Sequence, residues 1–185
     1  MGGIEIAAAL LGVINVVLVV RRSTWNYPFG ILMVALYFFV FWDSKLYSDA
    51  LLQIFFLVIQ LYGWWAWVHA RHVDHGVAVR WMPANQRLRW LAGTAVAVAL
   101  WGSGMARFTD AAAPFVDATT AGLSITAQCL QSLRRVESWA LWIAVDVIAI
   151  GLFAWRELYV TSALYALFLV LAVIGLLEWR RKSEA

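Results

Sequence analysis

Long apolar stretches separated by short polar ones run through the whole chain. Most of them approach the ~20 residues that a helix needs to cross the hydrocarbon core of a bilayer. Because lipid offers no hydrogen-bond partner to the backbone, we expect helices rather than strands. The pattern predicts seven membrane helices, over residues 4–20, 27–42, 49–68, 90–106, 114–132, 138–154 and 159–178, with a long polar connection at 70–89.

The composition agrees with a membrane protein. Of the 185 residues, 64% are hydrophobic and 14% are charged, whereas a soluble domain is about half apolar and about a quarter charged. The 12 Trp also fit, since Trp gathers at membrane interfaces and around ligands. The first apolar run lacks a preceding basic region and a small-residue cleavage site, so we expect a retained helix. Residues 1–185 are expected to form one all-α integral membrane domain.

The basic residues favour one orientation in the membrane. With the N-terminus outside, all 14 Lys and Arg except Lys45, Arg107 and Arg156 fall on the inner side. Cytoplasmic loops carry an excess of Lys and Arg. The prediction is therefore a multi-pass protein of the bacterial inner membrane, with a periplasmic N-terminus and a cytoplasmic C-terminus.

A shift of the sequence by 112 residues reveals an internal repeat. It predicts two three-helix bundles, residues 1–68 and 114–178, joined by a linking helix at 90–106. Because four helices separate equivalent positions, the two bundles should run in the same direction through the membrane, as in one known transporter plan. Coincidence in an apolar chain is the alternative explanation. The matched pairs include Phe41 and Phe153, Leu46 and Leu158, Tyr47 and Tyr159, Phe56 and Phe168, Gly63 and Gly175, and Trp67 and Trp179.

One face of the predicted helix 138–154 carries Trp139, Trp142 and Asp146. Their spacing of three and four residues is helical. A carboxylate near the middle of a membrane helix costs about 2.5–3.5 kcal/mol on insertion scales, so it needs a compensating role. An aromatic wall beside an anion suits a flat cationic ring. The alternative is interfacial Trp with an Asp that is hydrogen-bonded to a neighbouring helix.

Polar residues also share faces of two other predicted helices. Such stripes face either neighbouring helices, through interhelical hydrogen bonds, or a polar pathway. We interpret them as lining a pathway for a small molecule, and the aromatic cluster after Gln60 as mainly an interface belt. The candidates are Asp117, Thr120, Ser124, Gln128 and Gln131 on one helix, and Asp49, Gln53, Gln60 and Trp64 on the other, with Tyr37, Tyr165 and Asn15 as weaker ones.

The motifs of other chemistries are missing from the sequence. It has no G-x-x-x-x-G-K-[ST] loop for ATP, no G-x-S-x-G and no H-E-x-x-H. His69, His72 and His75 stand with Asp74 in the polar connection, where we expect a solvated segment and not a metal site. The sequence predicts neither an enzyme nor a cofactor, metal or nucleic-acid binder. It predicts a transporter that meets lipid and a small substrate.

Several motifs give the chain a resemblance to the PnuC family of bacterial vitamin transporters. They are WNYPFG from Trp25 to Gly30, LYSD from Leu46 to Asp49, YGW from Tyr62 to Trp64, and W-x-x-W at 139–142 after Glu137. The resemblance implies the 3+1+3 helix plan, shared with the SWEET transporters. It implies uptake of nicotinamide riboside by facilitated diffusion, trapping by a cytoplasmic kinase, and often a homotrimer. It also implies substrate contacts from Trp139, Trp142 and position 146, with Gln53, Gln60 and Gln128 as additions.

Position 146 departs from the pattern of nicotinamide riboside members, which carry Asn where this chain carries Asp146. An anion there favours a cation, and both nicotinamide riboside and thiamine are cations. Thiamine is therefore the alternative substrate. Two further hypotheses are a proton-coupled symporter that uses Asp146 or Asp117, and a membrane scaffold or sensor without transport.

Overall fold

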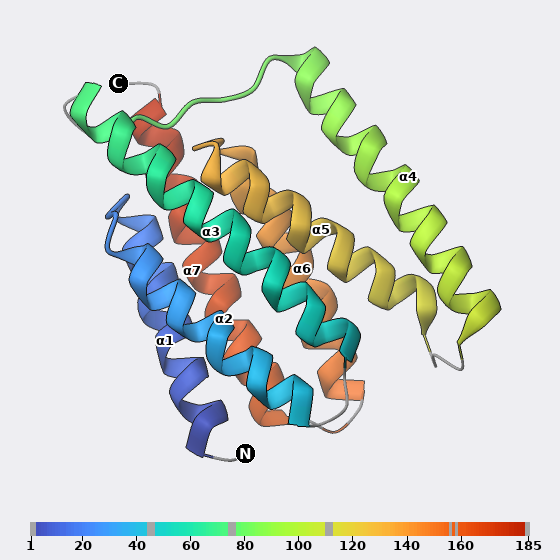
Figure 1. Cartoon of the computed structure of the whole chain (residues 1–185). Coiled ribbons are helices and arrows are strands. Elements are labelled where there is room, and N and C mark those ends of the chain that lie inside the picture. The colour runs from blue at the N-terminus through green and yellow to red at the C-terminus, as the bar shows by residue number, and fades with distance from the viewer. Residues whose placement is uncertain are drawn as a thin grey trace.

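The structure is a computed structural model that describes residues 3–43, 47–73, 77–109, 113–155, 157 and 159–183. Within these residues it confirms the seven predicted helices, and it contains no strand. Figure 1 shows them as long rods. Their bounds are α1 Gly3–Val20, α2 Asn26–Asp43, α3 Tyr47–Val73, α4 Ala84–Phe108, α5 Pro114–Ser132, α6 Glu137–Trp155 and α7 Tyr159–Ser183.

The long polar connection is shorter than predicted. Helix α3 continues to Val73, and α4 begins at Ala84, so both helices extend into the segment 70–89. Backbone hydrogen bonding continues past the apolar stretch because a helix needs no apolar side chains once it is in water. Pro83 stands just before α4 with extended backbone angles (φ −64°, ψ 153°) and marks where the helix begins.

Six helices form a closed ring, and the seventh lies outside it. The packing order around the ring is α1, α2, α3, α5, α6 and α7, and α7 returns to α1. Among the described residues, α4 packs along α5 and reaches α6 through the ion pair between Arg87 and Glu137. Figure 1 shows α1, α3, α5 and α7 running in one direction and α2, α4 and α6 in the other. These directions are those that two parallel bundles require, and the 3+1+3 division stays a prediction.

Five helices in the described part are long and apolar enough to cross a membrane, namely α2, α3, α4, α6 and α7. The apolar part of α1, Ile6–Val20, is shorter, and α5 carries the polar stripe. Figure 1 shows α1 and α5 running alongside the others. That α1 and α5 also cross the membrane stays a prediction.

Basic residues gather where α1, α3, α5 and α7 end and α4 begins, and we call this the basic end. Figure 1 shows these helix termini at one end of the bundle. The described Arg and Lys residues there are Arg21, Arg22, Arg71, Arg80, Arg87, Arg89, Arg134, Arg135, Arg180, Arg181 and Lys182.

Helices α1 and α5 end in the same way at positions 112 residues apart. Arg22 (φ 55°) and Arg134 (φ 60°) both adopt the left-handed conformation. Ser23 N donates to Leu18 O at 2.9 Å, and Arg135 N donates to Leu130 O at 2.8 Å. Each end is a Schellman motif, in which a left-handed residue lets the chain cap the last carbonyls. Matching backbone geometry supports the repeat independently of side-chain similarity.

An aromatic ring packs on a glycine in each half of the chain. Trp139 lies against Gly175 and meets Trp179 edge-on, with ring centroids 5.5 Å apart at 90°. In the first half, Tyr27 lies against Gly63. It meets Trp67 edge-on at 5.4 Å and 88°. Trp67 and Trp179 then contact each other at 5.9 Å, so the two equivalent units meet in the core at the basic end.

Candidate functional site

The ring of six helices encloses a cavity of about 480 Å³. This volume lies in the range of about 300–1,000 Å³ that is usual for small-molecule sites. Every helix of the ring contributes to the lining, and α4 does not. Nine of the twelve principal site candidates line it, namely Gln53, Gln60, Thr120, Ser124, Gln128, Gln131, Trp139, Trp142 and Asp146.

Helix α6 presents its aromatic and acidic residues to the cavity together. Trp139 and Asp146 are buried, with 2% and 4% of their surface exposed, and Trp142 is half-buried. Because a helix rises 1.5 Å per residue, Asp146 lies about 10 Å further along the axis than Trp139. The arrangement therefore offers a ring-binding wall that ends in a carboxylate about halfway along α6.

Neighbouring helices fix the orientation of both indole rings. Trp142 Nε1 donates to Gln131 Oε1 of α5 at 2.8 Å. Trp139 lies flat on Gly175 of α7, where an added Cβ would come within 2.6 Å of three ring atoms. In the described part of the chain, Trp139 Nε1 is buried and has no hydrogen-bond partner. Trp139 therefore carries a buried donor without a partner in the described part of the chain, next to the cavity wall.

The opposite wall of the cavity carries amides. Asn15 of α1 and Gln60 of α3 line it, and both pack over Gly30 of α2, which lies opposite α6 in the ring. A Cβ at position 30 would collide with both amide side chains. Asn15 Nδ2 donates to the carbonyl of Asn26 at 2.7 Å, which holds that side chain in place.

The repeat explains how the two walls differ. A shift of 112 residues relates Gly30 to Trp142 and Val34 to Asp146. Both members of the second pair are buried and line the cavity. Equivalent backbone positions therefore carry an aromatic and acidic surface in one half, and space for amides in the other.

Aromatic residues outside the candidate list also line the cavity. Phe41, Phe56, Phe153 and Phe168 do so, and Phe153 stacks on Tyr165 with centroids 5.3 Å apart. The repeat contained the signal that would have found them, because Phe41 aligns with Phe153 and Phe56 with Phe168. The weaker candidates Asn15, Tyr37 and Tyr165 line it too.

Two of the twelve principal candidates lie outside the cavity. Trp64 is 38% exposed and borders a shallow groove on the outer surface of α3. Asp117, in the first turn of α5, is absent from the lining, although the rest of its stripe lines it. The reason is geometric in each case, because a shared helix face does not reach the cavity along its whole length. The side chain of Asp49 is outside the described residues.

The histidines of the polar connection form no metal site in the part of the chain that can be assessed. His69 belongs to α3, and its Nδ1 lies 2.8 Å from the carbonyl of Trp65. The side chain of His72 and residues Asp74 and His75 lie outside the described residues. Among the described ones, no group of three metal-ligating side chains occurs.

Apolar helices around a partly polar cavity define the class of protein. The fold and the site are those of a multi-pass membrane transporter for a small organic molecule. Comparison with known proteins agrees with this class. Residues 2–181 match the family described as "Nicotinamide mononucleotide transporter".

The chain belongs to this family, which includes the PnuC proteins. It is 29% identical to the nicotinamide riboside transporter PnuC of Escherichia coli (strain K12), over 95% of this chain and 84% of that one. It is 31% identical to PnuC of Neisseria mucosa, over 94% and 70%. It is 27% identical to the riboflavin/roseoflavin transporter RibM of Streptomyces davaonensis, over 97% and 85%.

A solved structure has the same fold. The crystal structure of the vitamin B3 transporter PnuC superposes with a TM-score of 0.78 at 28% identity, and the match covers 96% of this chain and 80% of that one. The family membership that the sequence motifs indicated is thereby confirmed. Family membership by itself assigns no role to any single cavity residue.

Proposed function

We propose that this protein imports nicotinamide riboside across the bacterial inner membrane by facilitated diffusion. The observation that carries the proposal is the surface of α6, where Trp139, Trp142 and Asp146 all line one cavity. A pyridinium ring can stack on indole faces while its charge pairs with the carboxylate. Relatives named as nicotinamide riboside transporters support this substrate.

The amide wall fits the remainder of the substrate. Ribose hydroxyls both donate and accept hydrogen bonds, and the side chains of Asn15 and Gln60 offer both kinds of group. Gln53, Thr120, Ser124 and Gln128 add further polar groups to the lining. Such a site distinguishes strongly between a substrate that carries these hydroxyls and an analogue that lacks them, because the analogue leaves the amides unpaired.

Thiamine is the second candidate substrate, because it too joins a cationic ring to a hydroxyl-bearing chain. The buried carboxylate of Asp146 favours both cations over riboflavin, whose flavin ring is neutral, although one relative is named as a riboflavin transporter. A buried carboxylate that loses its counter-charge is costly. A direct comparison of binding affinities decides between nicotinamide riboside and thiamine.

The basic end supports an orientation in which it faces the cytoplasm. The N-terminus is then periplasmic and the C-terminus cytoplasmic. Substrate released at the basic end meets the cytoplasmic kinase that would trap it by phosphorylation. A homotrimer is part of the same proposal, and its stoichiometry can be measured by native mass spectrometry.

The test is a binding titration of the purified protein with nicotinamide riboside, thiamine and riboflavin. We expect nicotinamide riboside to bind most tightly. Replacing the carboxylate in Asp146→Asn removes a charge-assisted contact of about 1–3 kcal/mol, which weakens binding of a cation roughly 5–150-fold. Asp117→Asn is the matched control and should leave binding unchanged, because Asp117 does not line the cavity.

Two results would contradict the proposal. If none of the three vitamins binds, the chain is not a transporter of this substrate class, and a scaffold or sensor becomes the better explanation. If Asp146→Asn binds nicotinamide riboside as tightly as the unmodified protein, Asp146 is not the counter-ion.

A further inference from the structure

Residues 77–82, between α3 and α4, form a strap across the basic end of the ring. Figure 1 shows this connection passing over the ends of the ring helices before it reaches α4. Val77, Val79 and Met82 of the strap are buried, with 5%, 3% and 4% of their surface exposed, whereas Arg80 and Trp81 are exposed. A solvated linker would not bury alternate apolar side chains, so the strap is a packed element.

Both halves of the repeat hold the strap, at equivalent helix ends. Arg22, just after α1, donates from Nη1 to the carbonyl of Val77 at 3.0 Å. Arg80 N donates to the carbonyl of Arg134, just after α5, at 3.1 Å. Val136 N donates back to the carbonyl of Arg80 at 3.3 Å. Any motion that separates the two helix ends must break one set of these bonds.

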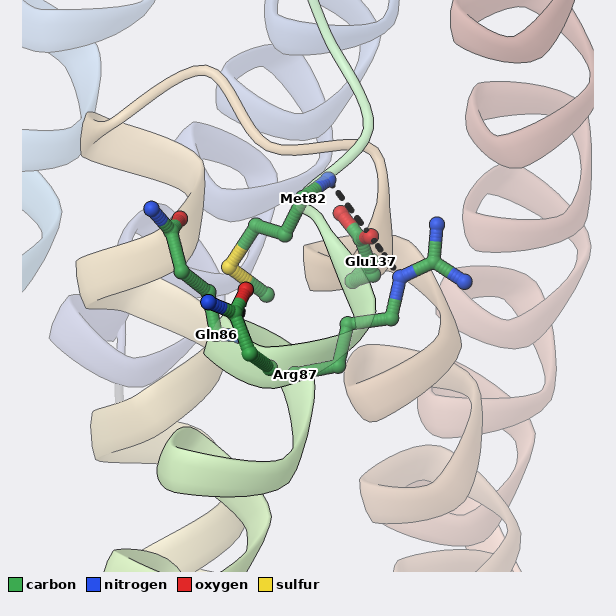
Figure 2. Close-up of polar contacts among 5 residues, drawn as sticks. Met82, Gln86, Arg87 and Glu137 are labelled. Atoms are coloured by element: carbon green, nitrogen blue, oxygen red, sulfur yellow. Dashed lines mark hydrogen bonds and ion pairs between the residues drawn. The ribbon is translucent and has the colours of Figure 1, made fainter.

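Glu137, the first residue of α6, fastens the far end of the strap. Its Oε1 accepts a hydrogen bond from Met82 N at 2.8 Å and one from Arg87 Nε of α4 at 2.7 Å. Figure 2 shows the carboxylate between these two donors. The Arg87 guanidinium also lies over the Trp81 ring, 5.3 Å from its centroid. The carboxylate therefore joins the strap, α4 and α6.

The strap packs behind the wall of the cavity at the basic end. Val19 and Trp139 line the cavity, and both belong to the buried cluster that contains Val77 and Val79 of the strap. Trp67 and Trp179 complete that cluster across the contact between the halves. A molecule in the cavity thus meets packed side chains of the strap behind Val19 and Trp139.

We propose that the strap is the gate through which the cavity empties at the basic end, with Glu137 as its latch. The proposal rests on the proposed function, because only a transporter needs this exit. Release of Oε1 frees Met82 N and Arg87 together, so one carboxylate controls two attachments. The other carboxylate oxygen, Oε2, is buried without a partner among the described residues. This unpaired oxygen makes the closed latch less costly to release.

A disulfide across the strap tests whether it must move. In a Cys129→Ala background, Arg80→Cys and Arg135→Cys place thiols at paired positions of a backbone bridge. Bridge partners lie about 4.7–4.9 Å apart, within the Cα range of ~4.4–6.8 Å that a disulfide allows. We expect the oxidised protein to lose at least about tenfold in the rate of nicotinamide riboside exchange in proteoliposomes, and dithiothreitol to restore it.

The two single-cysteine variants are the controls, because neither can form the bridge. Exchange at an undiminished rate in fully cross-linked protein would overturn the proposal. Binding of nicotinamide riboside by the cross-linked protein in detergent, measured alongside, shows that its fold is intact.

A labelling experiment tests the latch without any substrate. Val79→Cys, also in the Cys129→Ala background, places a buried thiol under the strap, and its reaction with a membrane-impermeant maleimide reports opening. Loss of the charge-assisted bonds in Glu137→Ala should raise the labelling rate about 10- to 100-fold. Glu137→Gln retains an acceptor for Met82 N and should give a smaller rise.

Glu178→Ala is the matched control. It removes another carboxylate at the basic end, whose ion-pair partner Arg181 lies at 2.8 Å on the same helix, and it should leave the labelling rate unchanged. Equal labelling rates in Glu137→Ala and Glu178→Ala would overturn the latch. Because no substrate is added, this result is independent of whether nicotinamide riboside is the molecule transported.

Discussion

At single positions, two glycines allow aromatic rings to lie directly on a helix backbone. Gly63 of α3 receives Tyr27, and Gly175 of α7 receives Trp139. Any side chain at either glycine would occupy the space of the ring. Because Trp139 also lines the cavity, Gly175 contributes both to packing and to the geometry of the site.

Gly175→Ala should destabilise the protein by about 1–3 kcal/mol, the usual cost of overpacking a filled core. The added Cβ would lie 2.6 Å from the Trp139 ring, so the ring must move and substrate binding should weaken as well. Thermal unfolding in detergent and a nicotinamide riboside titration measure the two effects.

Gly151→Ala on α6 is the matched control for this prediction. Nothing lies within 4 Å of the Cβ that it adds, and Ala favours a helix over Gly by up to about 1 kcal/mol. Equal melting temperatures and equal affinities for the two variants would show that the Trp139 ring does not depend on Gly175.

The spacing of side chains along one helix was sufficient to predict part of the site. Trp139, Trp142 and Asp146 share a face by helical geometry alone, and all three line the cavity. The space at Gly30 was not predictable from the sequence, because it exists only where α1 and α3 bring Asn15 and Gln60 over α2. The sequence also could not show that Trp64 lies on the outer surface of α3 and not in the cavity, because that too depends on how the helices pack.

At the scale of helices, α4 differs from the other six. It contributes nothing to the cavity lining and is held to α5 by small residues and one polar pair. Gly102 of α4 meets Phe115, and Gly122 of α5 meets Val98. The hydroxyls of Thr94 and Thr126 lie 2.7 Å apart. Small residues that permit close approach are typical of helix pairs in membranes.

Gly102→Leu should therefore reduce stability without changing the site. The Cβ at position 102 would lie 2.6 Å from the Phe115 ring, which forces α4 away from α5. We expect a lower melting temperature and an unchanged dissociation constant for nicotinamide riboside in the folded fraction. Gly104→Leu, where a Cβ meets nothing within 4 Å, should retain the original melting temperature. Weakened binding in Gly102→Leu would show that α4 supports the cavity.

The connection between α3 and α4 shows why helix bounds are harder to predict than helices. Apolar length predicts where a helix crosses lipid, but α3 and α4 extend beyond it into water. Within the connection, Val77 and Val79 are buried while Ala78 is partly buried and Arg80 is exposed. This short alternation was visible in the sequence. The backbone groups of Arg134 and Val136 that bond to the connection are distant along the chain, so the sequence alone could not reveal them.

At the scale of the whole molecule, the two halves share a framework and differ in chemistry. The Schellman ends at Arg22 and Arg134 and the paired aromatic units repeat after 112 residues. The polar residues that line the cavity do not repeat in this way. Val34 occupies the position in the first half that Asp146 occupies in the second. In the proposed transporter, a symmetric framework would let the two predicted bundles move against each other, while an asymmetric lining would bind an asymmetric substrate in one orientation.

The site also bears on the energy source of transport. In the proposed binding mode a cationic substrate pairs with the Asp146 carboxylate, so the loaded site would need no additional proton. In proteoliposomes with the membrane potential clamped at zero by potassium and valinomycin, labelled nicotinamide riboside should reach its external concentration and stop there. A transmembrane difference of one pH unit should not alter that level.

A proton-coupled carrier would behave differently under the same conditions. If one proton moves with each substrate molecule, a difference of one pH unit would drive accumulation up to about tenfold. One pH unit and a tenfold concentration ratio are each worth about 1.4 kcal/mol. Asp146→Asn, which cannot titrate, separates the two mechanisms further. In a passive carrier it slows or weakens uptake but leaves the final level at the external concentration. Accumulation that follows the pH gradient in the unmodified protein, and disappears in Asp146→Asn, would replace facilitated diffusion with coupling through this carboxylate.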